Sequence, residues 1–214
     1  MSTVKFYDLL SAHPEIWWSP NTYKTRFLLN YKEIPYTVIP THYPDIRDVS
    51  LKLNLAEDWY PKWPLPIIEH DGNVIRGSLD IAKYLDSAFR ERRLMGEECE
   101  KWQQYISKNV LLAVWPMTGP MVPTILDERD AKFFRDTRKV PERIENHAKV
   151  VEAMSPLNEG IKQSGYIYRG RIHYADFVLG SIFVWILRTK EEDFQKIMKA
   201  AGIEEWWQKL AVHM

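Results

Sequence analysis

The chain has 214 residues, 45% of them hydrophobic, so it can form one large domain or two smaller ones around a substantial core. Its 29 basic and 29 acidic residues balance, which excludes the basic electrostatic field typical of proteins that bind nucleic acids. The single cysteine, Cys99, excludes an intrachain disulfide framework and indicates a reducing compartment.

The sequence predicts neither a targeting segment nor a membrane-spanning segment. The first residues lack the basic region followed by an apolar stretch that marks a signal peptide. The longest apolar run, residues 177–187, is too short to cross a membrane and indicates a buried helix instead. We therefore expect a cytoplasmic protein that has no membrane partner.

The N-terminal residues predict a strand, a helix and a second strand. A short apolar run over 4–10 predicts a buried strand, and a helix is expected over 20–30. Ser19 is a candidate N-cap of this helix, and Pro20 suits its first position, where a missing N–H costs nothing. Pro35 ends the helix, and the second strand follows over 36–39. Such a unit implies parallel strands joined by a right-handed crossover.

The next segment predicts a hairpin followed by an amphipathic helix. A short helix is expected over 44–53, and the proline- and aromatic-rich residues 58–66 predict an irregular loop. Strands at 67–69 and 74–75 flank a turn at Gly72, and Pro66 before them is a candidate for a cis peptide bond. Ser78 is the expected N-cap of the helix that follows.

The remainder of the chain predicts only helices. They are expected over 97–115, 128–138, 142–161, 174–187, 194–201 and 204–210. Pro116, Pro120 and Pro123 should kink or interrupt the chain. The order of elements predicts an α/β N-terminal domain over residues 1–90 and an all-α C-terminal domain over 95–214.

Three features occur in a recognisable order: Ser19-Pro20-Asn21 opening the first helix, Leu65-Pro66 before the hairpin, and Ser78 opening the next helix. A thioredoxin-like domain of this pattern, followed by helices that include a buried one at 175–177, resembles the glutathione transferases. Three stretches look like the fungal glutathione transferases related to bacterial β-etherases: Trp18-Ser19-Pro20-Asn21-Thr22-Tyr23-Lys24-Thr25-Arg26, Asn30-Tyr31-Lys32 and Tyr43-Pro44-Asp45-Ile46. The resemblance covers essentially the whole chain and implies the glutathione transferase fold.

The resemblance implies a site for glutathione as co-substrate. The backbone at Leu65 and Pro66 would receive the cysteinyl part, and Ser78 the γ-glutamyl carboxylate. The catalytic hydroxyl or amide falls on Ser19, with Asn21 as the other candidate. It also implies a homodimer. Lys52 and Lys62 are candidate partners of the glycyl carboxylate, although a solvated lysine is the simpler interpretation of each.

The implied chemistry is activation of a thiol. A free thiol has a pKa of roughly 8.5, and a hydrogen bond together with the positive end of the helix over 20–30 would lower it. The second substrate, a small and aromatic electrophile, should lie between the domains, because aromatic and methionine side chains suit flat apolar ligands. Candidate wall residues are Trp17, Trp18, Trp115, Met117 and Met121. The alternative is that they only pack the domain interface.

Two positions depart from the family pattern. Gly77 replaces the acidic residue that usually precedes the serine, so we expect a lower affinity for the amino group of glutathione. His173 replaces the hydroxyl residue that usually caps the buried helix three residues before Asp176, which we interpret as structural. The six histidines show no metal-ligand spacing, so no metal is expected.

Three functions remain open at this point. The first is a serine-type glutathione transferase that takes part in detoxification. The second is a ligandin, which binds aromatic molecules with little or no catalysis, and the β-aryl etherase reaction is an enzymatic rival with the same thiol chemistry. The third is a structural or regulatory partner protein with a vestigial site.

Overall fold

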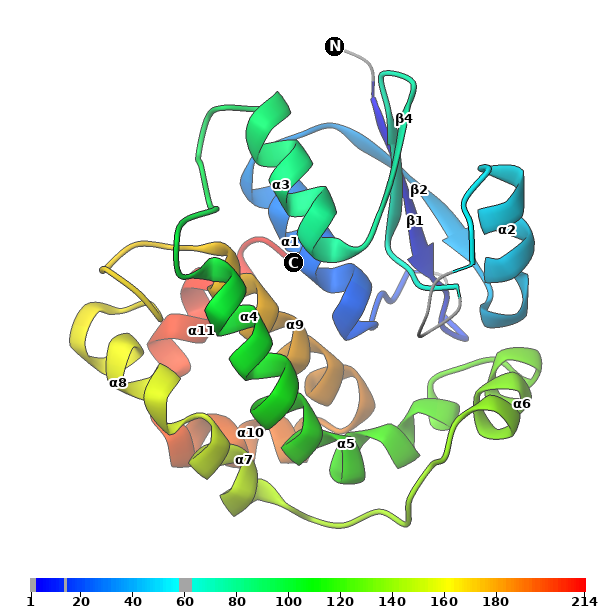
Figure 1. Ribbon diagram of the computed structural model, residues 1–214. Coiled ribbons are helices and arrows are strands. Elements are labelled where there is room, and N and C mark those ends of the chain that lie inside the picture. The colour runs from blue at the N-terminus through cyan, green and yellow to red at the C-terminus, as the bar shows by residue number, and fades with distance from the viewer. Residues whose placement is uncertain (1–2, 14, 58–62) are drawn as a thin grey trace.

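The computed structural model describes residues 3–13, 15–57 and 63–214 and shows a sheet domain above a larger helical domain (Figure 1). The elements of the sheet domain are β1 (Val4–Leu9), α1 (Pro20–Tyr31), β2 (Tyr36–Thr41), α2 (Ile46–Lys52), β3 (Ile67–His70), β4 (Asn73–Arg76) and α3 (Ser78–Ala88). A 3-10 turn over Tyr43–Asp45 leads into α2. This N-terminal half is the predicted α/β arrangement, and the loop expected over 58–66 lies partly outside the described residues.

The described strands form one sheet in the order β2-β1-β3-β4. β1 pairs in parallel with β2, in the register Val4 to Tyr36, as the strand–helix–strand pattern predicts. β1 also pairs with β3, and β3 with β4, in the antiparallel sense. The hairpin turn has a positive φ at both Asp71 and Gly72, the conformation that two-residue hairpin turns favour. The peptide bond between Leu65 and Pro66 is cis, which confirms that prediction.

The helical domain is built around α9 (Tyr174–Thr189), whose residues 174–186 are all buried. The other α-helices of this domain in the described part of the chain are α4 (Cys99–Tyr105), α5 (Leu111–Thr118), α6 (Glu128–Thr137), α7 (His147–Ala153), α8 (Ser155–Ser164), α10 (Glu191–Ala201) and α11 (Glu204–Ala211). α9 also packs against α1, where the rings of Phe27 and Phe177 stack with centroids 5.4 Å apart. The predicted buried helix is therefore confirmed, and it joins the two domains. No helix in the described part of the chain is long and apolar enough to span a bilayer.

Several predicted helix boundaries are wrong. The helix expected over 142–161 is two helices, α7 and α8, because Pro156 has no N–H to continue the first helix and instead lies in the first turn of the second. The helix expected over 97–115 contains a π-helical turn, Ile106–Val110, and α5 runs past Pro116 to Thr118. A 3-10 segment, Gly119–Thr124, holds the other two prolines.

Ser78 is the first residue of α3 and not its N-cap, which is Gly77. The φ of Gly77 is +92°, a backbone conformation that residues with a side chain rarely adopt. The glycine rather than the serine therefore makes the turn from β4 into the helix. The prediction for Ser78 was therefore wrong by one position. Its consequence is that the Ser78 hydroxyl is not used to cap α3.

Candidate functional site

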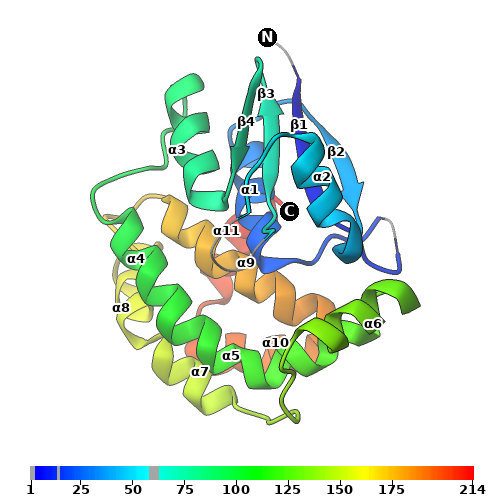
Figure 2. The ribbon, with the colours of Figure 1, turned by 45° about the vertical axis from the view of Figure 1, so that its right-hand side comes forward.

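A cavity of about 800 Å³ lies between the sheet domain and the helical domain. Its sheet-domain lining is Leu9, Trp18, Ser19, Pro20, Asn21, Tyr43, Ile46, Trp63, Pro64, Leu65, Pro66, Gly77 and Ser78. Its helical-domain lining is Leu111, Leu112, Trp115, Val122, Phe134, Thr137, Arg138, Lys139 and Trp185. Figures 1 and 2 show α6 reaching from the helical domain toward α2, on the side of the molecule where α1 begins. The cavity therefore brings together segments that lie far apart in the sequence.

Both α1 and α3 begin at this cavity. Ser19 is the N-cap residue of α1, as predicted, yet its hydroxyl makes no capping hydrogen bond, and the first turn of α1 has no acidic residue. Ser78 opens α3. The start of a helix carries unpaired N–H groups and the positive end of the helix dipole. Two such starts facing one cavity, each with a hydroxyl, form a polar region suited to anionic groups.

A backbone hydrogen bond joins two of the segments that line the polar region. The Gly77 N–H donates to the carbonyl oxygen of Pro66 at 2.9 Å. Through this bond the cis Leu65–Pro66 segment is fixed beside the start of α3. The structure thus places all five residues predicted to bind glutathione or act in catalysis, which are Ser19, Asn21, Leu65, Pro66 and Ser78, on the lining of one cavity.

Asn21 is oriented by a buried lysine. The ammonium Nζ of Lys24 donates to Oδ1 of Asn21 at 3.1 Å. Because an ammonium group can only donate, the amide oxygen of Asn21 faces Lys24. The Nδ2 group of Asn21 therefore remains available as a hydrogen-bond donor to the cavity. Lys24 is only 8% exposed, and its burial lowers the pKa of the ammonium group to about 8.

Replacing Lys24 with methionine should raise the free energy of unfolding at pH 7 by roughly 1–3 kcal/mol, because the folded state no longer buries a charge. The pKa of Lys24 is lower in the folded chain, at about 8, than the roughly 10.4 of an unfolded lysine. Folding is therefore most disfavoured below pH 8, and stability rises between pH 8 and about 10.4. Urea unfolding at pH 7 and pH 10.5 should show the gap between wild type and variant closing at the higher pH.

Lys149→Met is the matched control, because Lys149 is exposed on α7. It should leave stability unchanged at both pH values. A Lys24→Met protein with the wild-type stability at pH 7 would contradict the buried-charge interpretation.

The opposite side of the cavity is an aromatic wall. Trp115 lies 6.0 Å from Trp185 and 6.3 Å from Phe134, and Phe134 lies 5.7 Å from Tyr43, all between ring centroids. The guanidinium of Arg138 covers the rings of Tyr43 and Phe134. Such a wall suits a flat apolar ligand.

Two of the predicted wall residues, Trp18 and Trp115, line the cavity, and three do not. The ring of Trp17 lies 4.6 Å from the guanidinium carbon of Arg26. Met117 is fully buried, because two residues along a helix from Trp115 it points to another side of α5. Met121 lies on the 3-10 segment and is likewise absent from the lining. The wall role of these three positions stays a prediction, and packing within the protein is its alternative.

The other residues of the observed wall are hard to predict from the sequence. In the sequence, Tyr43 stands out only through the family resemblance, and Trp185 only as part of the predicted buried helix. Phe134 and Arg138 belong to the charged segment over 128–138, whose composition predicts an exposed helix. The one usable signal is the strong amphipathic pattern of α6, whose apolar positions include Phe134.

The charged residues of the described lining are Arg138 and Lys139, both cationic. With the two helix starts they make the cavity electropositive, which favours an anionic ligand. Lys52 instead lines a smaller cavity of about 310 Å³ beside α2, and Lys62 lies outside the described residues. The site can therefore hold a polar anionic molecule next to an apolar one.

Comparison with known families identifies this architecture. Residues 16–93 match the N-terminal domain of glutathione S-transferases, and residues 99–214 match their C-terminal domain. The chain belongs to the glutathione S-transferase family. Transfer of glutathione is the reaction of this family, and the predicted glutathione transferase fold is confirmed.

Similar proteins come from fungi. The glutathione S-transferase-like protein UstS of Aspergillus flavus is 28% identical over 92% of this chain and 85% of its own length. The crystal structure of glutathione transferase GSTFuA3 from Phanerochaete chrysosporium superimposes with a TM-score of 0.88 at 24% identity, covering 100% of this chain and 98% of that one. The glutathione complex of CsGST63524 from Ceriporiopsis subvermispora gives a TM-score of 0.83 at 26% identity, over 99% and 96% of the two chains. The relation to bacterial β-etherases stays a prediction.

Proposed function

We propose that this family member is a serine-type glutathione transferase that activates the thiol of glutathione for attack on small aromatic electrophiles, in a detoxifying role. The observation that carries the proposal is the composition of the large cavity between the domains. Its polar side has the starts of α1 and α3 with Ser19 and Ser78, and its other side has the aromatic wall. The glutathione complexes of similar fungal proteins support the choice of co-substrate.

Glutathione would lie along the polar side of the cavity. Its γ-glutamyl carboxylate would accept hydrogen bonds from the start of α3 and from the Ser78 hydroxyl. Its cysteinyl part would pair with the backbone at Leu65 and Pro66, in the manner of a strand added to a sheet edge. Gly77 provides no carboxylate for the amino group of glutathione, so this anchor is missing from the proposed site.

The thiol would then face the start of α1. The Ser19 hydroxyl makes no capping hydrogen bond, so it can donate to the sulfur. The dipole of α1 stabilises the negative charge of the thiolate. Lowering a thiol pKa by about two units corresponds to about 2.7 kcal/mol of preferential stabilisation of the thiolate. The sulfur attacks the electrophile held against the aromatic wall, and its proton passes to solvent. The proposed mechanism uses no metal and no separate general base.

Calorimetric titration with glutathione at neutral pH tests the proposed binding site. The Ser78→Ala variant should bind glutathione at least tenfold more weakly than the wild type, because it removes one hydrogen bond to a charged group. Ser87→Ala is the matched control, since Ser87 is exposed near the other end of the same helix, and it should bind like the wild type. A wild-type chain that does not bind millimolar glutathione would overturn the proposal.

A second candidate is a ligandin, favoured by the aromatic wall and by glycine at position 77. Tight binding of polyphenols with negligible thiol transfer over a broad panel of electrophiles would support it. Cleavage of β-aryl ethers uses the same activated thiol, and identification of the reaction products would distinguish it from conjugation. For either function we propose a cytoplasmic homodimer with a glutathione-binding domain over 1–90 and a helical domain over 95–214.

A further inference from the structure

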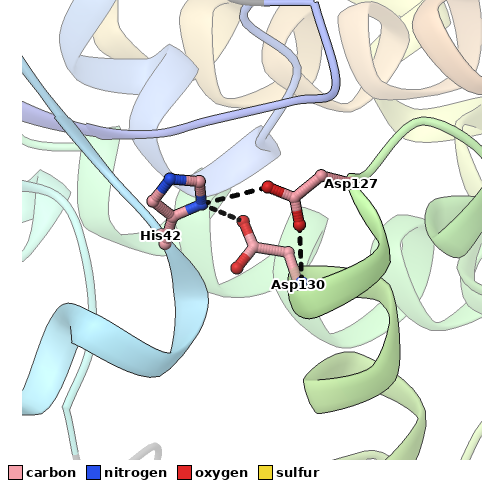
Figure 3. Close-up of side chains that lie close together, drawn as sticks. All are labelled: His42, Asp127 and Asp130. Carbon is pink, nitrogen blue, oxygen red and sulfur yellow. Dashed lines mark hydrogen bonds and ion pairs between the residues drawn. The ribbon is translucent and has the colours of Figure 1, made fainter.

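A histidine and two aspartates meet at the boundary of the two domains, outside the lining of the large cavity (Figure 3). His42 lies between β2 and the 3-10 turn of the sheet domain. Asp127 is the N-cap of α6 in the helical domain, and Asp130 lies in the first turn of that helix. The spacing of the histidines alone predicts no metal site, because both aspartates are more than 80 positions away from His42 in the sequence.

The three side chains converge on a single point. Nδ1 of His42 lies 3.0 Å from Oδ2 of Asp130 and 3.4 Å from Oδ2 of Asp127. The three candidate ligand atoms all lie within 4.8 Å of one another. Two ligands bound tetrahedrally to one zinc ion at about 2.0–2.1 Å are about 3.3 Å apart. The two separations from Nδ1 of His42 are already close to that value.

The backbone holds both carboxylates in this orientation. Oδ1 of Asp130 accepts a hydrogen bond from the Tyr43 N–H at 3.1 Å, and Oδ1 of Asp127 accepts one from the Asp130 N–H at 2.8 Å. Each aspartate therefore has one oxygen fixed by the main chain and the other directed at His42. Support of this kind is what orients ligands in metal sites.

We propose that His42, Asp127 and Asp130 form a binding site for Zn²⁺ or a similar divalent transition-metal ion. Imidazole nitrogen and carboxylate oxygen are ligands that zinc accepts, and three protein ligands with a water in the fourth position are a common arrangement. The side chain of Asp130 is 1% exposed, whereas those of His42 and Asp127 are about one-third exposed, at 34% and 38%. The exposed side gives the ion a path to the site and a place for the water.

The site would act as a clamp between the domains. Tyr43, which follows His42, and Phe134, one turn of α6 beyond Asp130, both line the large cavity. A metal ion that binds the folded arrangement and not the unfolded chain stabilises the fold, by an amount that grows with the logarithm of the free ion concentration once this exceeds the dissociation constant. Zinc would thus fix the distance between these two parts of the cavity wall.

His147 also pairs with an aspartate, but in a cluster whose third member is a cation. His147 lies 2.8 Å from Asp193, but the second partner of that carboxylate is the cation Arg143, at 2.7 Å. A guanidinium repels a metal ion and donates no lone pair. His147 is therefore a matched control: it is a histidine bonded to an aspartate in a cluster that cannot bind zinc.

Calorimetric titration with Zn²⁺, on the full chain without an affinity tag and after treatment with a chelator, tests the site. We expect one zinc ion per chain, with affinity reduced at least tenfold in His42→Ala and in Asp127→Asn, and unchanged in His147→Ala. Asn is a good N-cap, so Asp127→Asn keeps the hydrogen bond that starts α6 while it removes the charged ligand. Mg²⁺ should not replace zinc, because it avoids nitrogen ligands.

Visible absorption of bound Co²⁺ provides a second measurement, because its intensity depends on a low-coordinate environment that includes His42. Loss of the signal in His42→Ala together with an unchanged melting temperature without metal would locate the ion at this cluster. Failure of the wild type to bind millimolar Zn²⁺, or equal affinity in all four proteins, would overturn the proposal. In that case the cluster is an ion pair between the domains and nothing more.

Discussion

Replacing Ser19 with alanine should raise the pKa of the thiol of bound glutathione by about one to two units and lower turnover near pH 6.5 by ~10–100-fold. The reason is local. The Ser19 hydroxyl lies at the start of α1 on the cavity lining and makes no capping hydrogen bond, and the residue is buried, with 3% exposure. A hydrogen bond donated there to a thiolate is charge-assisted and shielded from water. Without it, a larger fraction of the bound thiol stays protonated at neutral pH.

The rate of conjugation with a nitroaryl halide, measured from pH 5.5 to pH 9, gives the pKa of the bound thiol directly. The acidic limb of the profile should move to higher pH in Ser19→Ala, and the rates should approach those of wild type above the new pKa. Ser87→Ala, remote on α3, should keep the wild-type profile.

Asn21→Ala separates the two candidates for the thiol contact. If Ser19→Ala keeps the wild-type profile and Asn21→Ala shifts it, the donor is the Asn21 amide, which the Lys24 hydrogen bond orients. If neither variant shifts the profile, the backbone N–H groups of α1 stabilise the thiolate without a side chain.

The parts of the fold that could be predicted have local causes. Pro20 and Ser19 mark the start of α1 through the chemistry of a helix start, and Pro66 marks the cis bond because proline alone makes that isomer accessible. The uninterrupted apolar run of α9 indicates burial on all sides. Each of these signals lies within the residues that it describes, so no tertiary information is needed.

The parts that could not be predicted depend on how separate segments meet. Met117 and Trp115 belong to one apolar helix, and only its packing decides that Trp115 faces the cavity while Met117 is buried. Tyr43 and Phe134 meet because α6 crosses to the sheet domain, which no periodicity in either segment records. The shift of the α3 cap from Ser78 to Gly77 has the same origin, because the tertiary path of the chain sets the positive φ at that turn.

The start of α9 lacks the hydroxyl residue that usually caps this helix in the family, and the Asp176 carboxylate holds this helix start instead. The imidazole of His173 does not take over the missing cap, since its Nδ1 lies 2.8 Å from the carbonyl oxygen of Arg171. Instead the His173 N–H donates to Oδ2 of Asp176 at 2.9 Å. Oδ1 of the same carboxylate accepts from the Ile167 N–H at 3.0 Å and from the indole N–H of Trp206 at 2.8 Å. Asp176 thus joins the start of α9 to the preceding loop and to α11.

Asp176→Ala should therefore lower the free energy of unfolding by about 3–5 kcal/mol, because it leaves three buried donors without an acceptor. Asp176→Asn should lower it less, since the amide oxygen can still accept from Ile167 and Trp206. Urea unfolding measures both values. The exposed Asp48, replaced with alanine, is the control and should change stability by no more than about 0.5 kcal/mol.

The pH dependence of the same variants tests the electrostatics of this helix start. Burial raises the pKa of Asp176 to about 6, above the roughly 3.9 of an unfolded aspartate. The folded state therefore binds the proton more tightly, so the contribution of this group to stability is greatest below pH 4 and falls as the pH rises to 6. The amide of the Asp176→Asn variant cannot titrate. The free energy of unfolding of this variant should therefore not show the decrease between pH 4 and pH 6 that we expect for the wild type. A variant that unfolds like the wild type but loses turnover would contradict the structural role and make Asp176 part of the chemistry.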